Sequence, residues 1–345
     1  MRVELQSPHE THTFEAPSGE PILFAALRQR FEVPYGCASG TCGTCRVKCV
    51  SGAIANAWHG APGMNGGEAG EVLLCQCSAL GDVVLQTRSP VKRSAADAPV
   101  GGHLEGELRP GRVLARDVME FAVALDAPMS FEAGQFAALE IPGVEGRRMY
   151  SMTNYERAST RLDFVVKRKP GGAFSSRLFS AGARPARVKV FGPLGRASFV
   201  PSLDKELIVV AGGSGIAGMM SILRHAVDER YFERHRGRVY FGVRTWADAF
   251  YLARLSKMAR AARGGLSVTL ALSDEDAPPD AQAKFPELSL ARGFVHEVAA
   301  RACEGQGRNA RAYVAGPPLA VEASLRSLLR QAKVPPAEIR YDKFE

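Results

Sequence analysis

The chain has 345 residues, which is too long for one ordinary hydrophobic core and suggests two or three domains. Hydrophobic residues make up 46% and charged residues 23%, which excludes a disordered or low-complexity chain. The net charge of +8 is spread over residues 98–345 and forms no single stripe or tail, which argues against nucleic-acid binding and favours sites for phosphate-rich cofactors. No apolar run approaches the length of a membrane span and the N-terminus lacks a secretory signal, so we expect a cytoplasmic protein with no membrane partner.

The first part of the chain alternates short strand-like runs with one amphipathic segment, residues 21–31. The strand candidates are Arg2–Gln6, Thr11–Glu15, Arg46–Val50 and Val83–Thr87. Residues 88–103 are polar, aperiodic and rich in Ala, Pro and Gly, which is typical of a linker. We therefore expect a first domain over residues 1–90 and a linker over residues 91–103.

Six of the seven cysteines lie between residues 37 and 77, and such clustering in a reducing compartment favours a metal site over disulfides. Cys37, Cys42 and Cys45 have the spacing C-x4-C-x2-C, and Cys75 follows after 29 further residues. This spacing is that of plant-type [2Fe–2S] ligation. Three glycines allow the loop to wrap a cluster closely: Gly36, Gly40 and Gly43.

Zinc is the alternative, but its sites usually combine two C-x2-C pairs, and this chain has one unless Cys75 and Cys77 form an irregular second pair. Cys75 and Cys77 are two residues apart and would face the same way on a strand, so the residues alone leave the fourth ligand open between them. Cys49 and Cys303 are expected to pack in hydrophobic cores.

Residues 104–202 are short strand-like runs separated by Gly and Pro, which predicts a small antiparallel barrel. Arg148 and Tyr150 would share a strand face and offer a cation for phosphate and a ring for stacking, while Ser151 faces the other way or ends the strand. A glycine turn, Gly171–Gly172, leads into a helical stretch from Phe174 whose backbone N–H groups suit a pyrophosphate. Behind an iron–sulfur domain, these features together favour a flavin.

From residue 203 onward, strand-like runs alternate with helical stretches at about 216–230, 247–263, 293–303 and 318–332, which predicts an open parallel sheet. The strand candidates are Glu206–Ala211, Arg238–Val243, Leu266–Leu272 and Ala312–Val314. The turn Gly212–Ile216 follows a strand and opens a helix, which suits nucleotide phosphates, although G-x-G-x-x-G is absent. Arg244 and the segment 315–318 also follow strands, at the edge where such folds bind ligands.

Together these motifs resemble the NAD(P)H reductase components of bacterial multicomponent oxygenases, in the ferredoxin–NADP reductase superfamily. The resemblance spans essentially the whole chain, and segments 57–63 and 333–344 look most like reductases of toluene and related aromatic or alkene diiron monooxygenases. It implies a β-grasp [2Fe–2S] ferredoxin domain, an antiparallel FAD barrel over 104–202 and an α/β NAD domain over 203–345 with a C-terminal tail reaching the flavin. It also favours Cys75 as the fourth ligand after Cys37, Cys42 and Cys45.

The resemblance further assigns the other sites residue by residue. Tyr150 would stack on the flavin and Ser151 would hydrogen-bond near its N5 atom, as the two catalytic residues. The remaining FAD contacts would be Arg148, Met152, Val165, Val166, Lys167, Gly171, Gly172, Phe174, Ser175, Ser176 and Phe344. The NAD contacts would be Gly213, Ser214, Gly215, Ile216, Arg244, Ala315, Gly316 and Pro317. Two positions depart from the family pattern: Ala217 replaces its usual Pro, and Ala315 replaces its usual Cys beside the nicotinamide.

The implied function is electron transfer from NADH through FAD and the [2Fe–2S] cluster to an oxygenase component or its Rieske ferredoxin. NADH is favoured over NADPH because no basic cluster for a 2′-phosphate follows Arg244. We expect a monomer that meets its partner transiently. The alternatives are a reductase partner of a deoxysugar-forming dehydratase, and a structural electron-transfer subunit or redox sensor.

Overall fold

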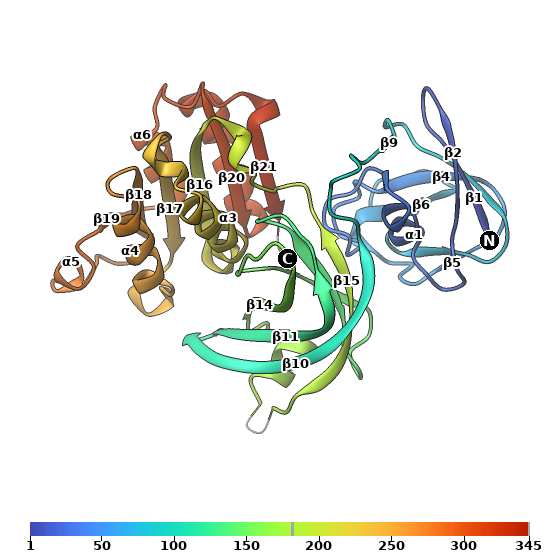
Figure 1. The fold of residues 1–345 in the computed structure, drawn as a ribbon, viewed down its shortest axis with the longest axis horizontal. Helices are drawn as coiled ribbons and strands as arrows, with labels where there is room; N and C mark the ends of the chain where they lie inside the picture. Colours follow the sequence, from blue (N-terminus) through green and yellow to red (C-terminus); the bar gives the residue numbers. More distant parts are fainter. Residues whose placement is uncertain (181–182, 344–345) are drawn as a thin grey trace.

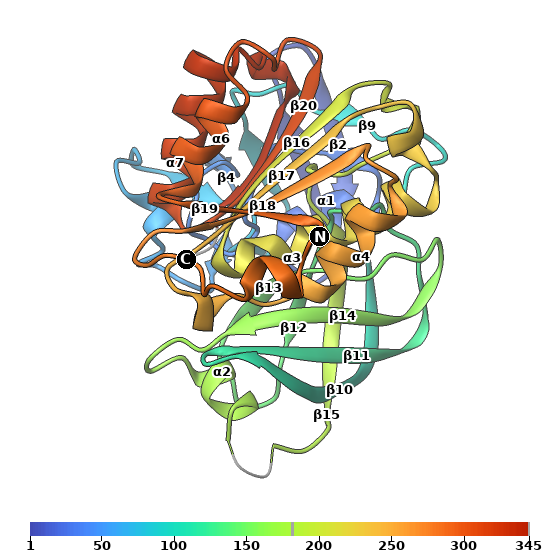
Figure 2. The same ribbon diagram turned by 90° about the vertical axis from the view of Figure 1, so that its left-hand side faces the viewer.

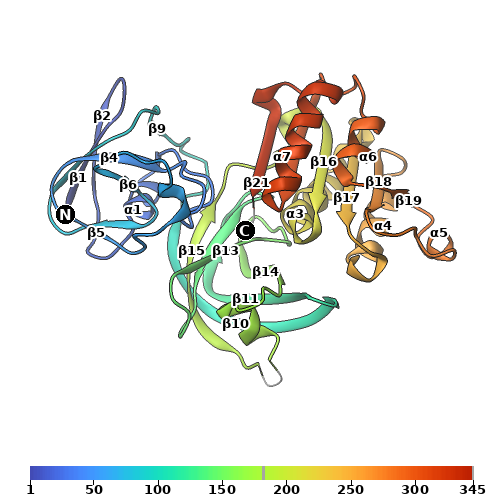
Figure 3. The same ribbon diagram turned by 180° about the vertical axis from the view of Figure 1, so that it is seen from behind.

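A computed structural model describes residues 1–180 and 183–343 and shows three large sheets along the chain, together with two sheets of two short strands each. The barrel of the middle part lies between the N-terminal sheet and the C-terminal parallel sheet, as the two opposite views in Figures 1 and 3 show. All three sheets have the architecture that the sequence predicts.

The N-terminal sheet has the order β2-β1-β8-β4-β6, with β1 parallel to β8 and antiparallel to β2. Helix α1 (Ile22–Arg28) was expected to be amphipathic, but its residues 22–26 are all fully buried in the core under this sheet, so only its C-terminal end reaches solvent. The strands are β1 (Arg2–Gln6), β2 (Thr11–Glu15), β3 (Phe31–Glu32), β4 (Arg46–Ser51), β5 (Ile54–Asn56), β6 (Glu71–Leu73), β7 (Cys77–Ala79), β8 (Val83–Gln86) and β9 (Lys92–Arg93), with a short helix η1 (Pro62–Met64).

Part of the expected linker has regular structure. Strand β9 pairs antiparallel with β3, and Arg93 lies over the ring of Phe31 with its guanidinium carbon 4.2 Å from the ring centre. The first barrel strand begins at Gly102, inside residues 91–103. A strand of two residues is too short to show a periodic pattern, so β9 could not be predicted from its own sequence.

The barrel sheet is antiparallel throughout, in the order β13-β12-β15-β10-β11-β14. Its interior is filled by aromatic and aliphatic residues such as Phe121 and Phe164, whose rings stack 5.1 Å apart. In the part of the chain that the structure describes, no ladder joins the edge strands β13 and β14, so the barrel has an open seam. The elements are β10 (Gly102–Ala115), β11 (Val118–Met129), β12 (Phe136–Glu140), β13 (Arg147–Ser151), β14 (Ser159–Lys167), α2 (Ala173–Leu178) and β15 (Ala186–Leu194).

The C-terminal sheet is parallel, in the order β19-β18-β17-β16-β20-β21, with helices on both faces (Figure 2). Alternate residues of β16 explain the two layers: Val209 packs with α3 and α4 on one face, and Val210 packs with α6 and α7 on the other. The strands are β16 (Glu206–Gly212), β17 (Gly237–Val243), β18 (Leu266–Leu272), β19 (Leu288–Arg292), β20 (Ala310–Gly316) and β21 (Ile339–Lys343). The main helices are α3 (Ile216–Asp228), α4 (Leu252–Ala261), α5 (Ala281–Lys284), α6 (Val295–Ala302) and α7 (Pro318–Ser327).

Three details differ from the expected elements. Strands β19 and β21 were not among the expected strands, because both are edge strands with few buried residues and lack a continuous apolar run. The helix expected at 247–263 starts only at Leu252, because Tyr251 has a left-handed backbone with φ of 61° that ends the preceding turn. The helix expected at 318–332 is an α-helix only up to Ser327, and residues Leu328–Ala332 form a wider helical turn after it.

Candidate functional site

The cysteine loop brings four thiols together in two pairs. The Cys42 backbone N–H donates to Cys37 Sγ over 3.3 Å, and the Cys37 N–H donates to Cys42 Sγ over 3.4 Å. The second pair joins Cys45 and Cys75, whose sulfur atoms lie 3.3 Å apart and are buried. Hydrogen bonds with Cys42, Ser39 and Thr41 lower the pKa of the Cys37 thiol to about 3, and the same contact raises the pKa of Cys42, so the proton of this pair stays on Cys42.

The pairing distinguishes a two-iron cluster from zinc. Within residues 1–180 and 183–343, no three His, Cys, Asp or Glu side chains surround a single point where one metal ion would bind. A structural zinc ion needs four ligands around one centre, whereas a [2Fe–2S] cluster takes two thiolates on each of two irons. One thiol pair within the loop and a second that joins the loop to the turn between β6 and β7 therefore fit the cluster better than a single zinc ion.

Steric crowding explains why two positions of the cysteine loop are glycine. At Gly43, where φ is 73°, an added Cβ would lie 2.9 Å from the carbonyl oxygen of Gly63. At Gly40, where φ is 91°, it would lie 3.1 Å from the ring of Trp58. The loop can therefore fold this tightly only with glycine at these positions.

The structure also separates the remaining cysteines. Cys75 lies in the turn between β6 and β7, so Cys75 and Cys77 do not share one strand as expected. Cys77 is buried in the core, whereas the sulfur of Cys75 lies 3.3 Å from that of Cys45, and this pairing favours Cys75 as the fourth ligand. Cys303 is fully buried with its sulfur 3.2 Å from the Tyr240 hydroxyl, and Cys49 lies half-buried on the Val47 face of β4. Core packing thus accounts for Cys303.

The predicted flavin residues gather at the open seam of the barrel. Tyr150 packs its ring edge-on against Phe121, with centroids 5.1 Å apart, and lies beside Phe174 of α2. Burial raises the pKa of Tyr150, so its hydroxyl stays neutral. Arg148 is on the same strand, and its guanidinium donates to the backbone carbonyls of Glu145 and Arg147. The seam therefore presents an aromatic face and a cation next to each other.

Ser151 ends β13 and is buried, yet its Oγ atom has no hydrogen-bond partner among the described residues. A buried hydroxyl without a partner is unfavourable, so its position suggests a missing group. An added Cβ on Gly218, in the first turn of α3, would lie 3.3 Å from this Oγ. The hydroxyl therefore lies where the barrel meets the first turn of the nucleotide helix, which fits a flavin site.

The other predicted flavin segments lie on the same side of the barrel. Val165 packs against the core shared with the C-terminal sheet, Val166 points into the barrel, and Lys167 pairs with Asp117 over 3.4 Å. Gly171 has a φ of 70° and Gly172 precedes α2. The other predicted flavin contacts, Ser175, Ser176 and Met152, differ from one another in burial. Ser175 is buried and its hydroxyl bonds to Lys169 and Gly172, Ser176 is exposed, and Met152 is fully buried.

Two of the predicted NAD segments meet at the carboxyl ends of β16 and β20. Ser214 and Ile216 flank Gly215, where an added Cβ would lie 2.4 Å from the Ala315 carbonyl oxygen. Gly316 has a φ of 146° and lies against Gly212. Gly213 has a φ of 53° and open space around it, and Pro317 caps α7. The turn and the 315–317 segment therefore form one glycine-lined edge beside Ser151.

Arg244 is exposed at the end of the neighbouring strand β17, and its Nε donates to Asp274 Oδ2 over 3.1 Å. Ser273 and Arg244 lower the pKa of Asp274, so this edge carries a carboxylate as well as the predicted cation. Sequence reasoning missed Asp274, although it follows β18 closely.

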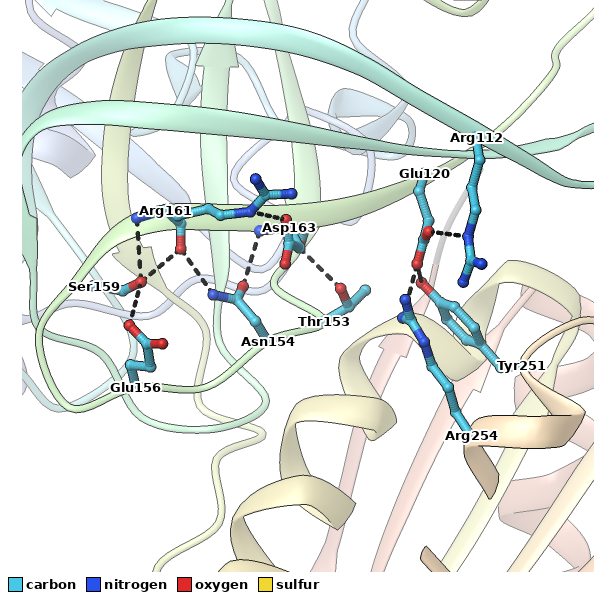
Figure 4. Close-up of polar contacts among 10 residues, drawn as sticks. All are labelled: Arg112, Glu120, Thr153, Asn154, Glu156, Ser159, Arg161, Asp163, Tyr251 and Arg254. Carbon is cyan, nitrogen blue, oxygen red and sulfur yellow. Dashed lines mark hydrogen bonds and ion pairs between the residues drawn. The ribbon is translucent and has the colours of Figure 1, made fainter. Parts of the chain in front are cut away.

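A carboxylate that the sequence did not indicate joins the barrel to the C-terminal sheet (Figure 4). Glu120 of β11 accepts from the Tyr251 hydroxyl over 2.8 Å and pairs with Arg254 over 2.7 Å, while Arg112 of the barrel donates over 2.8 Å. These contacts lower the pKa of Glu120 against the effect of burial. Because Glu120 is paired with Val165 in the β11–β14 ladder, this ion-pair cluster holds the C-terminal sheet against the predicted flavin edge.

The last described strand, β21, lies at the same edge. Strand β21 pairs with β20 so that Asp342 lies opposite Ala315. Phe344, predicted to cover the flavin, lies outside the described residues.

Asp342 gives a pH-dependent prediction. Burial raises the pKa of its carboxyl from 3.8 to about 6. The folded state then favours the protonated form, so the free energy of unfolding falls as the pH rises from about 4 through 6. We expect Asp342→Asn to be more stable than the wild type by about 2 kcal/mol at pH 8, with a margin that shrinks toward pH 5. Thermal unfolding across this range checks it, with exposed Asp97→Asn as the control. An equal margin at every pH would contradict it.

No helix in the described residues is long and apolar enough to cross a membrane.

Comparisons with known proteins agree with this arrangement. Family models match in chain order: the 2Fe-2S iron-sulfur cluster binding domain at residues 6–80, the oxidoreductase FAD-binding domain at 105–199 and the oxidoreductase NAD-binding domain at 209–325. The ferredoxin–NAD(+) reductase component of the alkene monooxygenase system of Xanthobacter autotrophicus is 32% identical over 97% of this chain and 99% of its own.

A ferredoxin–NAD(P)(+) reductase of Metapseudomonas resinovorans is 30% identical over 100% of this chain and 99% of its own. Among solved structures, the ferredoxin reductase in carbazole 1,9a-dioxygenase superimposes with a TM-score of 0.83 at 27% identity, covering 100% of this chain and 99% of that one.

Proposed function

The chain belongs to the ferredoxin–NAD(P)+ reductase components of bacterial multicomponent oxygenases, and from this membership we propose that it carries electrons from NADH to an oxygenase. The observation that supports this most directly is the position of Ser151, where the predicted flavin site meets the nucleotide helix. This buried, unpartnered hydroxyl touches the nucleotide helix at Gly218, in a barrel that also packs against the cysteine domain.

Different parts of the chain would hold the different cofactors. When bound, FAD supplies the conversion of a hydride into single electrons, and the [2Fe–2S] cluster supplies a one-electron carrier. Tyr150 and Arg148 would hold the flavin ring and its phosphate side, and the edge formed by Gly213–Ile216 and Ala315–Pro317 would hold the nicotinamide nucleotide. Cys37 and Cys42 would bind one iron, and Cys45 and Cys75 the other. No residue is needed as an acid or base, because hydride transfer requires only alignment.

We propose that the acceptor is the hydroxylase of an aromatic or alkene oxygenase, or its Rieske ferredoxin, reached through a transient contact in the cytoplasm by a monomeric reductase. The segments around the cluster support such a contact. Residues 33–45, 53–67 and 72–81 contain no Lys, Arg, Asp or Glu, and they expose Trp58 and Cys42. A small uncharged face suits brief docking by shape.

We also propose that the first domain ends at residue 90, the linker at residue 103 and the flavin barrel at residue 202.

An anaerobic titration with NADH tests the proposed function. The expected result is loss of both the flavin and the iron–sulfur absorbance of the purified protein, and electron delivery to a one-electron acceptor. Bleaching of the flavin alone would leave the cluster outside the pathway, and no bleaching at all would refute the proposal.

Asp274 gives a prediction about the nucleotide. A carboxylate at this edge repels a 2′-phosphate and suits a free 2′-hydroxyl, so we propose NADH as the donor. We expect Asp274→Ala to raise kcat/KM for NADPH about tenfold while changing that for NADH less, because the variant frees Arg244 for the phosphate. Steady-state kinetics with both nucleotides checks it. Asp276→Ala, which removes the exposed partner of Arg292, is the matched control and should leave the ratio unchanged. Equal shifts in both variants would contradict the role of Asp274.

A further inference from the structure

The cysteine domain shares a hydrophobic core with the barrel. Phe24 of α1 stacks on Phe191 of β15, with ring centroids 3.9 Å apart and planes 4° from parallel. Phe136 and Leu194 of the barrel belong to the same buried cluster as Val3 and Leu5 of β1. The two parts are therefore packed face to face and do not meet only through the linker.

One polar contact in this junction comes from the cluster loop itself. Tyr35 lies two residues before Cys37, and its hydroxyl oxygen accepts a hydrogen bond from the Gly195 backbone N–H over 2.8 Å. Arg196 adds a second bond, from its Nη2 to the Val33 carbonyl oxygen over 2.9 Å, and lies over the Tyr35 ring at 5.7 Å. In the described residues, the Tyr35 hydroxyl makes no hydrogen bond within its own domain, so this bond serves the junction.

The other end of this contact leads to the predicted flavin site. Gly195 follows β15 directly and has a φ of 98°, and an added Cβ would lie 2.8 Å from the ring of Phe136. Phe136 is paired with Ser151 in the β12–β13 ladder. The path from the first cluster ligand to the unpartnered hydroxyl therefore runs through Tyr35, Gly195 and Phe136, each in contact with the next.

We propose that Tyr35 is a positioning residue for electron transfer between the two cofactors: its bond to Gly195 fixes the cluster loop against the flavin barrel. The proposal rests on the proposed function. One NADH becomes NAD+ and a proton, and its two electrons pass singly from the flavin to the cluster. The rate of each transfer depends on the separation of the cofactors, so a loop that is held in place transfers faster than one that shifts.

Tyr35→Phe tests this, because it removes only the hydroxyl and keeps the ring. In stopped-flow mixing with NADH, we expect flavin bleaching to keep its rate and cluster bleaching to slow about five- to tenfold, the effect of losing one neutral hydrogen bond. Arg196→Met should act in the same direction. Tyr231→Phe is the matched control, because the Tyr231 hydroxyl exchanges its hydrogen bonds with the Lys205 backbone, inside the C-terminal sheet domain.

Two further measurements separate positioning from damage. The electron paramagnetic resonance spectrum of the dithionite-reduced cluster should be the same in Tyr35→Phe and the wild type, and amide hydrogen exchange around Gly195 should rise only in the variant. Cluster bleaching as fast as in the wild type, or slowed equally by Tyr231→Phe, would overturn the inference. A wild type whose flavin does not bleach with NADH would instead refute the proposed function.

Discussion

Replacing Cys75 by alanine is expected to abolish electron delivery to a one-electron protein acceptor while NADH still bleaches the flavin. Cys75 and Cys45 form the buried thiol pair, and removing one sulfur leaves one iron with a single protein ligand. The flavin seam and the nucleotide edge involve no atom of Cys75, so hydride transfer should continue. We expect at least a hundredfold loss of acceptor reduction, because the carrier itself is lost. The iron content, visible spectrum and cytochrome c reduction rate of the purified variant measure it.

Cys77→Ala is the matched control, because it removes a different cysteine thiol only two residues away. Cys77 is buried in the core with its thiol held neutral, so its loss should cost some stability and leave the cluster in place. A Cys77→Ala protein without iron, beside a Cys75→Ala protein with iron, would transfer the fourth-ligand role to Cys77.

The parts of the site that the sequence predicted are local in the chain. Cys37, Cys42 and Cys45 lie within nine residues, so their spacing alone indicates the cluster, and Gly213–Gly215 follows directly from β16. The open parallel sheet was also predictable, because its buried strands are continuous apolar runs. Such features need no knowledge of distant contacts.

What the sequence did not indicate depends on contacts between distant segments. Glu120 is 131 residues from Tyr251, and Tyr35 is 160 residues from Gly195, so no spacing rule connects them. Ser175 shows the opposite case. It was expected among the FAD contacts, but its hydroxyl bonds to Lys169 and Gly172 and shapes the turn, a use that its position in the motif does not reveal.

Ser151→Ala is expected to slow NADH-driven flavin reduction about a hundredfold, the usual effect of removing one preorganised donor, without lowering the stability of the cofactor-free fold. The Ser151 hydroxyl is buried and has no partner in residues 1–180 and 183–343, so its removal takes away a desolvated group and breaks no hydrogen bond within that part of the chain. Its position against Gly218 places it where flavin and nicotinamide would meet. Stopped-flow rates and thermal unfolding of the apoprotein measure the two effects separately.

Ser221 is a second buried serine at the same junction, and its replacement should affect stability instead of the reaction rate. Its buried hydroxyl accepts from the Gly134 backbone N–H over 2.9 Å and donates to the Gly218 carbonyl oxygen over 2.9 Å. Ser221→Ala leaves that buried N–H unpaired, so we expect it to cost about 1–3 kcal/mol of stability and to change the hydride rate little. The two serines lie on opposite sides of the same contact between barrel and helix, yet one should affect the rate alone and the other the stability alone. If Ser151→Ala lowered the melting temperature as Ser221→Ala does and kept the wild-type rate, the Ser151 hydroxyl would be structural and the flavin site would have to lie elsewhere on the seam.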